Sequence, residues 1–221
     1  MRVVPGPDAG FLAAEQAEWP FHVSALLVLE ASESERFSLD ALRTQLLNRL
    51  HEVPQFRWML RDDVLPFLTK PVWVDDPHFD IDRHLHRVAV PSPGDERELA
   101  LLVGELVATR LARTKPLWEM WVIEGLEDGR VAIFSKVHHS IVDGEAGVEL
   151  VTLLFDLEAN PEPGPPPPEW VPEPAPSATA QLTNAATGLI SWPMKAARLG
   201  WSSIRQGATY AAHSGDEDGA A

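Results

Sequence analysis

Alternating apolar and polar positions mark the strands that this chain is expected to form. In residues 130–137, Val131, Ile133, Ser135 and Val137 fall on one face of an extended chain, and the residues between them fall on the other. Successive side chains of a strand point to opposite faces of a sheet, so this pattern predicts a strand. Further strands are predicted near residues 22–30, 72–75, 86–90 and 118–125.

Apolar residues at helical spacing separate these strands. Leu39, Leu42, Leu46 and Leu50 recur three or four positions apart behind Ser38, a residue type that caps helix N-termini. Strands that alternate with helices predict an α/β fold, in which helices flank a mixed sheet. The predicted helices lie near residues 8–17, 38–52, 95–112 and 145–157, the last of them almost wholly buried.

One run between the last predicted strand and the last helix carries candidate chemistry. From His138 to Gly144 the chain reads HHSIVDG, the pattern HHxxxDG, which indicates acyl transfer. A neutral imidazole is well suited near neutral pH to take a proton from a hydroxyl or amine that attacks a carbonyl carbon. Neighbouring strand side chains diverge, so we expect one histidine to be the base and the other to support it. Asp143 is expected to cap the next helix or orient the motif, and Gly144 to form a turn that a ligand could approach.

Other chemistries fit this sequence less well. Two histidines and an aspartate could ligate zinc, but their spacing differs from HExxH and the chain has no cysteine, so we expect no metal. Without cysteine there is no disulfide framework and no thiol nucleophile, and no GxSxG sequence marks a serine nucleophile. Direct transfer to the acceptor, with histidine as general base, is the mechanism that remains. Taken singly, each motif residue also has a purely structural interpretation, as a core histidine, a helix cap or a turn.

Several segments around the motif resemble the bacterial wax ester synthase/diacylglycerol acyltransferase family. The resemblance extends over residues 1 to about 158. The similar segments are PDAGFL at 7–12, PFHV at 20–23, FDIDRH at 79–84, PSPG at 91–94, PLWEMWVIEGL at 116–126, then Gly129-Arg130, Lys136 and the HHxxxDG run.

This resemblance implies a chloramphenicol acetyltransferase-like fold and a long-chain acyl-CoA-dependent O-acyltransferase that forms triacylglycerol or wax ester. His139 would be the general base that takes the proton from diacylglycerol or a fatty alcohol, with no acyl-enzyme, and His138 would support it. Asp143 would organise the motif, and Gly144 would keep the acyl-CoA channel open. Acyl-CoA would be a co-substrate, and no permanently bound cofactor is expected.

The PLW element has two interpretations. The resemblance associates Pro116, Leu117 and Trp118 with substrate binding in the channel, but Pro-Leu-Trp before an alternating strand is equally typical of a packed strand entry. The chain also departs from the family pattern. Ser140 stands where Ala is usual, which conserves size, and Ala112 stands where Asp often precedes the element, which weakens a local polar contact.

Chain length and proline content predict the domain organisation. Members of the family are about twice as long, and the resemblance implies a tunnel between two similar halves. We therefore expect this chain to be the N-terminal half, with a C-terminal half in the same or a separate chain as its partner. Nine of the 20 prolines lie between residues 161 and 176, as in a semi-rigid spacer. The predicted parts are an acyltransferase domain at 1–158, a Pro-rich linker at 159–177, a helical segment at 178–212 and an acidic disordered tail at 213–221.

Charge narrows the partners. The chain has 33 acidic and 18 basic residues, a net charge of −15, which disfavours nucleic acid. Segment 178–212 is apolar and cationic, so we expect it to pack on the second half or on a lipid surface. No apolar run of 18 residues and no signal-peptide pattern is present, so the expected location is cytoplasmic, at most peripheral to the inner membrane or lipid inclusions.

Two alternative functions stay open at this point. One is an amide-forming enzyme similar to condensation domains, against which the PLWE-to-IEGL context argues. The other is a non-catalytic binding or scaffold fragment that keeps the motif for structural reasons.

Overall fold

The computed structural model describes residues 2–30, 38–61, 71–142, 154, 166–175 and 177 of the 221-residue chain. The chain separates into two compact units, and the described residues apart from Ser177 belong to the unit formed by Met1–Arg61 and Pro71–Ala175. This unit carries the sheets, the helices and the two histidines of the motif.

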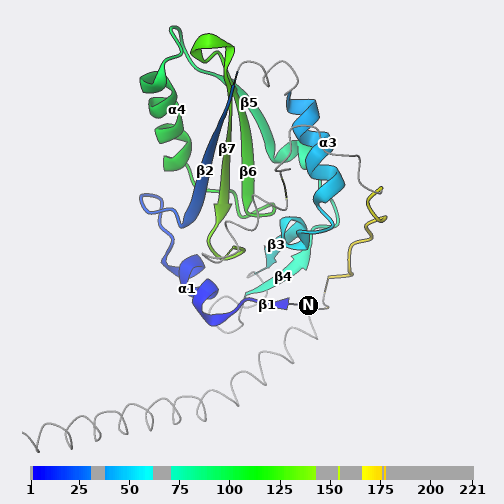
Figure 1. Ribbon diagram of the computed structural model, residues 1–221. Helices are drawn as coiled ribbons and strands as arrows, with labels where there is room; N and C mark the ends of the chain where they lie inside the picture. The colour runs from blue at the N-terminus through cyan, green and yellow to red at the C-terminus, as the bar shows by residue number, and fades with distance from the viewer. Residues whose placement is uncertain are drawn as a thin grey trace, which may run out of the picture. The chain divides into compact units, whose positions relative to one another are not determined.

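The described part of the chain forms two sheets. The larger has the strand order β2-β7-β6-β5, in which β5 and β6 are parallel and the other neighbours are antiparallel (Figure 1). Its strands are β2 (His22–Leu29), β5 (Leu85–Ala89), β6 (Trp118–Glu124) and β7 (Val131–His138). The smaller, antiparallel sheet has the order β1-β4-β3, formed by β1 (Arg2–Val3), β3 (Trp58–Arg61) and β4 (Val72–Asp75).

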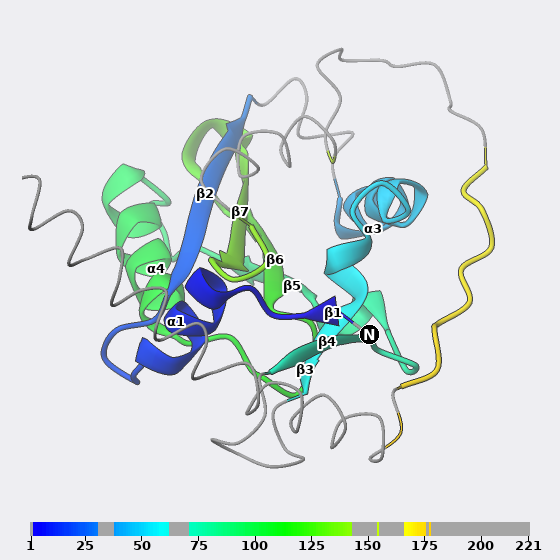
Figure 2. The same ribbon diagram turned by 90° about the horizontal axis from the view of Figure 1, so that it is seen from below.

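Two helices lie on opposite sides of the larger sheet, α3 (Leu39–Arg49) and α4 (Glu96–Ala108), as Figures 1 and 2 show. Helix α1 (Gly6–Ala14) lies near the end of β7 that carries the motif. There are three short 3₁₀ helices among the described residues, η1 (Pro54–Arg57), η2 (Ile81–Arg83) and η3 (Glu127–Gly129). The predicted mixed sheet with flanking helices is therefore confirmed.

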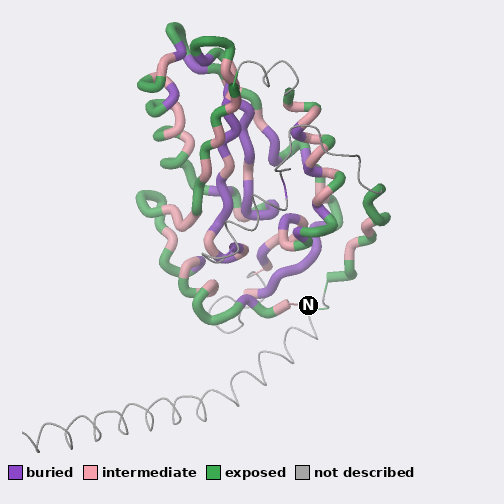
Figure 3. Tube along the Cα trace, viewed as in Figure 1, coloured by how far each residue is buried: buried purple, intermediate pink, exposed green. Residues whose placement is uncertain are grey.

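The core follows from alternation along the central strands. In β6, Trp118, Met120 and Val122 join the apolar cluster beneath α3, whereas Trp121 and Ile123 join the cluster beneath α4. Strand β7 divides in the same way, as its sequence predicts, and both of its faces are buried because a helix covers each side (Figure 3). Lys136 lies on this central strand, so its charged side chain is fully buried.

The predicted strands are confirmed to within a residue or two, and the predicted cap is confirmed by the Ser38 hydroxyl, which accepts the Ala41 amide at 3.1 Å. Three predicted helix ends were wrong, and one of them is that of the helix predicted at 38–52, which ends at Arg49. The helix predicted at 8–17 is Gly6–Ala14, because Glu15 turns to an extended conformation. The helix predicted at 95–112 ends at Ala108. There the Lys136 ammonium donates hydrogen bonds to the Leu106 and Thr109 carbonyls at 2.9 and 2.7 Å.

Some predicted segments lie outside the described residues. Of the helix predicted at 145–157 only Leu154 is described, in a helical conformation and buried. The segments at 178–212 and 213–221 are not described, so the proposed domain boundaries stay predictions. Within the described residues, no helix is long and apolar enough to cross a membrane.

Part of the Pro-rich segment, residues 166–175, is described and contacts the rest of its unit. The Trp170 ring lies under the Arg57 guanidinium at 4.8 Å and meets the Phe79 ring edge-on at 6.2 Å. Further along, the Glu173 amide donates to the Asp75 carboxylate at 3.0 Å. This stretch of the predicted spacer is therefore fastened at two points.

Candidate active site

The two motif histidines lie where β7 ends, between two segments that the sequence places far away. The amide of His138 donates to the Leu117 carbonyl, and the amide of His139 donates to the Phe21 carbonyl, each at 2.9 Å. His22, next to Phe21, is the register partner of His138 on β2. The sheet thus brings the HH pair beside both the PLW element and the start of β2.

His138 is almost fully buried, and its hydrogen bonds indicate its tautomer. The Ser140 amide donates to the His138 Nδ1 atom at 3.1 Å, and the Ser140 hydroxyl lies 2.6 Å from the same nitrogen. An amide N–H can only donate, so Nδ1 must accept and the neutral ring carries its proton on Nε2. Burial lowers the pKa of His138 to about 4; Glu15 raises it, whereas Arg113 and His22 lower it further.

Glu15 faces His138 from the end of α1. One carboxylate oxygen of Glu15 pairs with Arg113, whose Nη2 lies at 3.0 Å and Nε at 3.3 Å. The other oxygen, Oε1, lies 3.6 Å from the His138 Nε2 atom. The Glu15 side chain is only 2% exposed and the Arg113 side chain is 35% exposed, so the carboxylate end of this ion pair is buried beside the motif.

His139 points elsewhere, as strand geometry predicts for neighbouring residues. Its ring stacks on Phe11 of α1, with centroids 4.4 Å apart and planes 26° apart, and Phe21 lies 5.6 Å from Phe11. The Nδ1 atom of His139 is enclosed and has no hydrogen-bond partner among the described residues. The ring is thus held by apolar contact, not by a hydrogen bond within the described chain.

Unpaired buried polar atoms gather in this corner, which we call the histidine cluster (His22, His138, His139 and Glu15). Four of the five such side-chain atoms in the described part of the chain belong to it: Glu15 Oε1, His22 Nδ1, His138 Nε2 and His139 Nδ1. Burial lowers the pKa of His22, and the Lys136 charge lowers it further. Buried polar atoms are normally paired, so a local concentration of unpaired ones marks a candidate functional site.

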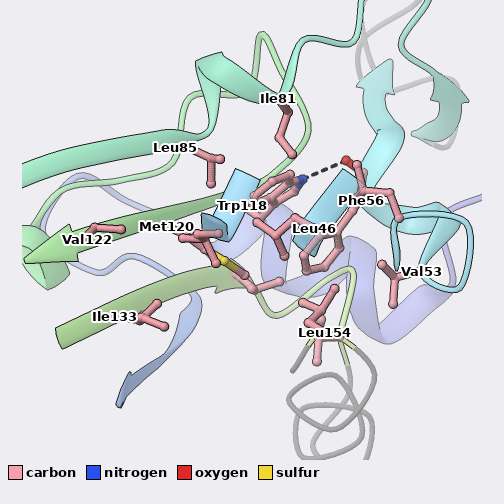
Figure 4. Close-up of a cluster of buried hydrophobic side chains, with 14 residues drawn as sticks. Leu46, Val53, Phe56, Ile81, Leu85, Trp118, Met120, Val122, Ile133 and Leu154 are labelled. Atoms are coloured by element: carbon pink, nitrogen blue, oxygen red, sulfur yellow. Dashed lines mark hydrogen bonds between the residues drawn. The ribbon is translucent and has the colours of Figure 1, made fainter. Parts of the chain in front are cut away.

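The PLW element lies in the core. Pro116, Leu117 and Trp118 are all buried, and the Trp118 indole donates to the Phe56 carbonyl at 2.7 Å (Figure 4). The Trp118 ring stacks on Phe56 and on His84, with centroids 4.8 and 4.3 Å apart. These contacts favour the packing interpretation of the three residues, and their contact with substrate stays a prediction.

We call the group formed by Phe56, Trp118, His84 and Phe79 the aromatic stack. His84 lies between Trp118 and Phe79, and its Nδ1 is 2.8 Å from the Trp118 carbonyl. Burial lowers the pKa of His84 to about 4. The stack therefore encloses a second neutral histidine, which ends the FDIDRH segment that resembles the family but was not predicted to be a site residue.

A buried charge network links the two regions. Glu119 of β6 lies 2.8 Å from the Lys115 ammonium and 3.9 Å from that of Lys136. Burial lowers the pKa of Lys136, and Glu119 partly offsets this effect. The network fastens β6 to β7 and to the end of α4.

Asp143 and Gly144 lie outside the described residues, so their predicted roles stay predictions. Among the residues that the structure describes, no group of three or more His, Asp or Glu side chains is arranged to hold a metal ion. The sequence does not mark Glu15, Arg113 or Phe11 as site residues. Two signals were available: Phe11 lies within the segment 7–12 that resembles the family, and the acidic Glu15 lies between that segment and the one at 20–23.

A fold of this kind with an HHxxxDG strand end defines the CoA-dependent acyltransferase-like class, and comparison with known proteins identifies the family. The wax ester synthase/diacylglycerol acyltransferase catalytic domain matches residues 5–213. The chain belongs to this family.

Relatives and solved structures agree with this assignment. One probable diacylglycerol O-acyltransferase of Mycobacterium tuberculosis is 36% identical over 80% of this chain and 65% of its own, and another is 45% identical over 67% and 32%. The wax ester synthase/diacylglycerol acyltransferase of Marinobacter aquaeolei is 33% identical, with a TM-score of 0.60 over 76% of this chain and 40% of its own.

A more distant structure shares the fold alone. The epimerization domain from the third module of tyrocidine synthetase B is 13% identical, with a TM-score of 0.55 over 69% of this chain and 33% of its own. The predicted chloramphenicol acetyltransferase-like fold is thereby confirmed. The chain matches between about two thirds and about one third of the length of these proteins.

Proposed function

We propose that this chain takes part in acyl-CoA-dependent O-acyl transfer that forms triacylglycerol or wax ester. Its membership of the family and the names of its relatives support this reaction. The observation that carries the assignment to a site is the end of β7, where His139 lies on Phe11 beside a buried and neutral His138.

His139 is the general base in this proposal. Its Nδ1 atom is enclosed, so Nε2 is the nitrogen that takes the proton from the hydroxyl of diacylglycerol or a fatty alcohol. The oxygen then attacks the thioester carbonyl, a C–O bond forms, the C–S bond breaks, and the proton ends on the released CoA thiol. No acyl-enzyme is needed, since the acceptor itself is the nucleophile.

The remaining motif residues have supporting roles. His138 braces the strand end, Asp143 organises the motif, and Gly144 leaves room for acyl-CoA. We also propose that a C-terminal half completes the site, because the relatives are longer than this chain. Pro116, Leu117 and Trp118 act on the channel indirectly, by fixing the strand beside the motif.

The test is release of CoA from palmitoyl-CoA with diacylglycerol or hexadecanol as acceptor. The chain is assayed alone and together with the C-terminal half of a longer relative. His139→Ala should remove activity, whereas His51→Ala, at an exposed histidine far along the chain from the motif, should not. Release that does not exceed the His139→Ala level in either setting would contradict the proposal.

A further inference from the structure

The Glu15 carboxylate is buried at the end of α1, although it comes 123 residues before His138 in the chain. Its Oε2 atom is paired with Arg113, and Arg113 also donates to the Leu12 carbonyl, which fixes the last turn of α1. Its Oε1 atom has no hydrogen-bond partner among the described residues. A buried carboxylate oxygen without a donor is costly, so a donor belongs there.

The atom that faces this oxygen is a donor. Since the Ser140 amide requires an unprotonated Nδ1 on His138, the ring proton lies on Nε2, which is the atom 3.6 Å from Glu15 Oε1. Glu15 Oε1 and His138 Nε2 are both buried atoms without a hydrogen-bond partner among the described residues. The first is an acceptor and the second is a donor, so each can satisfy the other. A shift of a few tenths of an ångström turns this contact into a charge-assisted hydrogen bond.

Helix α1 also contacts His139, the second histidine of the motif. Phe11 and Glu15 are four residues apart, so they project from the same side of the helix end. Phe11 lies against His139, and Glu15 lies against His138. One short element therefore contacts both histidines of the motif, each through a different kind of interaction.

The charge balance suits this arrangement. Arg113 neutralises Glu15, so the carboxylate can accept a hydrogen bond from His138 without drawing a proton onto it. A neutral His138 places no positive charge beside His139, and a cation there would weaken His139 as a base.

We propose that Glu15 is a positioning residue for the acyl transfer: its carboxylate, held by Arg113, fixes the His138 ring and thereby the strand end that presents His139. This role rests on the proposed function, because His139 is the base only in that reaction. The contact itself can be tested without any substrate.

The first test is nitrogen NMR of the histidine rings in the full 221-residue chain. We expect His138 to carry its proton on Nε2 throughout the neutral range. In Glu15→Leu the His138 Nε2 proton loses its acceptor, and the ring signals of both His138 and His139 should shift. Glu18→Leu removes the same charge from an exposed position three residues later and should leave both rings unchanged.

The second test is kinetic, with the same variants in the CoA-release assay. Glu15→Leu should lower kcat by roughly 10- to 100-fold with little change in KM for acyl-CoA, since a misplaced base impairs the chemical step and not binding. Glu15→Gln keeps the shape and an acceptor oxygen, so it should recover part of the loss. If Glu15→Leu unfolds, Glu15→Gln still tests the role through the His139 signals and kcat.

The outcomes separate this role from the reaction. A His138 proton on Nδ1, or His139 signals in Glu15→Leu that match those of Glu18→Leu, would overturn the positioning role even if the chain transfers acyl groups. Unchanged kcat in both Glu15 variants would overturn it as well. Absence of acyl transfer in the unaltered chain would instead count against the proposed function, and the NMR result would still decide the Glu15 contact.

Discussion

The aromatic stack and the histidine cluster meet at the start of β6, where Trp118 belongs to the stack and the neighbouring Leu117 carbonyl accepts the His138 amide. The two regions differ in how their buried polar atoms are paired. Each encloses a histidine whose pKa burial lowers to about 4. In the stack the polar atoms are paired, His84 with the Trp118 carbonyl and the Trp118 indole with the Phe56 carbonyl. In the cluster, four buried polar atoms have no partner among the described residues.

This difference favours a folding role for the aromatic stack and supports the chemical role that we propose for the histidine cluster. A paired and stacked histidine gains its stability from contacts already made within the chain. Unpaired buried groups cost stability, and such groups persist where a substrate or another function requires them. Both histidines look alike in burial and pKa, so only the accounting of hydrogen bonds distinguishes them.

The largest effect is expected from breaking the stack. Trp118→Ala removes a fully buried indole with its hydrogen bond and two ring contacts, so the free energy of unfolding should fall by about 4 kcal/mol. Denaturant titration followed by circular dichroism measures the loss, with exposed Trp19→Ala as the matched control. A stable Trp118→Ala variant with impaired acyl-CoA binding would instead favour a channel role for this side chain.

The next largest effect is expected when the pH is lowered, which should reduce the free energy of unfolding. Because the folded-state pKa values of His84 and His138 lie below the ordinary 6.5, the unfolded chain binds more protons between about pH 6.5 and about pH 4. Stability is therefore fully present above pH 6.5 and falls as the pH drops toward 4, by about 3 kcal/mol for His84.

Charged neighbours also shift the pKa of each histidine ring. Lys115 and Arg83 lower the pKa of His84 while Glu119 raises it; His138 faces Glu15, Arg113, His22 and His139. Unfolding free energies measured across this pH range should show a shallower slope in His84→Gln. An equal slope in the variant and the unaltered chain would mean that His84 titrates normally.

A smaller effect is expected from Lys136, which lies between the two regions. Lys136→Met keeps the length of the side chain but leaves the Leu106 and Thr109 carbonyls without their donor, so unfolding should be easier by about 2 kcal/mol. Hydrogen exchange should rise at the end of α4. Arg97→Met, at an exposed site on the same helix, provides the comparison; equal protection in the two variants would contradict the capping role.

The smallest effect is expected from Ser140→Ala. The variant removes the hydroxyl that lies 2.6 Å from the His138 Nδ1 atom, but the Ser140 amide still donates to that nitrogen. The tautomer should persist, and stability should change by about 1 kcal/mol or less. Thermal melting and histidine NMR measure both. A switch of the His138 proton to Nδ1 would show that the hydroxyl, not the amide, sets the ring.

Local patterns predict the elements of this fold well. Alternation located β6 and β7, leucine spacing located α3, and Ser38 was correctly expected as its cap, because each signal lies within a few neighbouring residues. Strands β1 and β3 were missed since they are short and gain their order from β4 between them. Where α4 ends depends on Lys136, about 30 residues later, which no local pattern contains.

The site was predictable only along its own strand. The HH pair was expected to diverge, and the described geometry agrees, with His138 facing Glu15 and His139 facing Phe11. Neither Glu15 nor Arg113 belongs to a recognisable motif, and they meet across 98 residues of sequence. Their contact arises because the segment between α4 and β6 packs on the end of α1, which local sequence patterns do not predict.

The pairing of β2 with β7 has a consequence for how the chain is made. Ala25 and Ser135, partners in this ladder, are 110 residues apart. A ribosome that adds roughly 5–20 residues per second therefore finishes β2 some seconds before its partner exists. During that interval β2, whose sequence HVSALLVL has no Lys, Arg, Asp or Glu, waits as an unprotected apolar segment. The histidine cluster needs both strands, so a newly made chain can complete this cluster only after β7 has been synthesised.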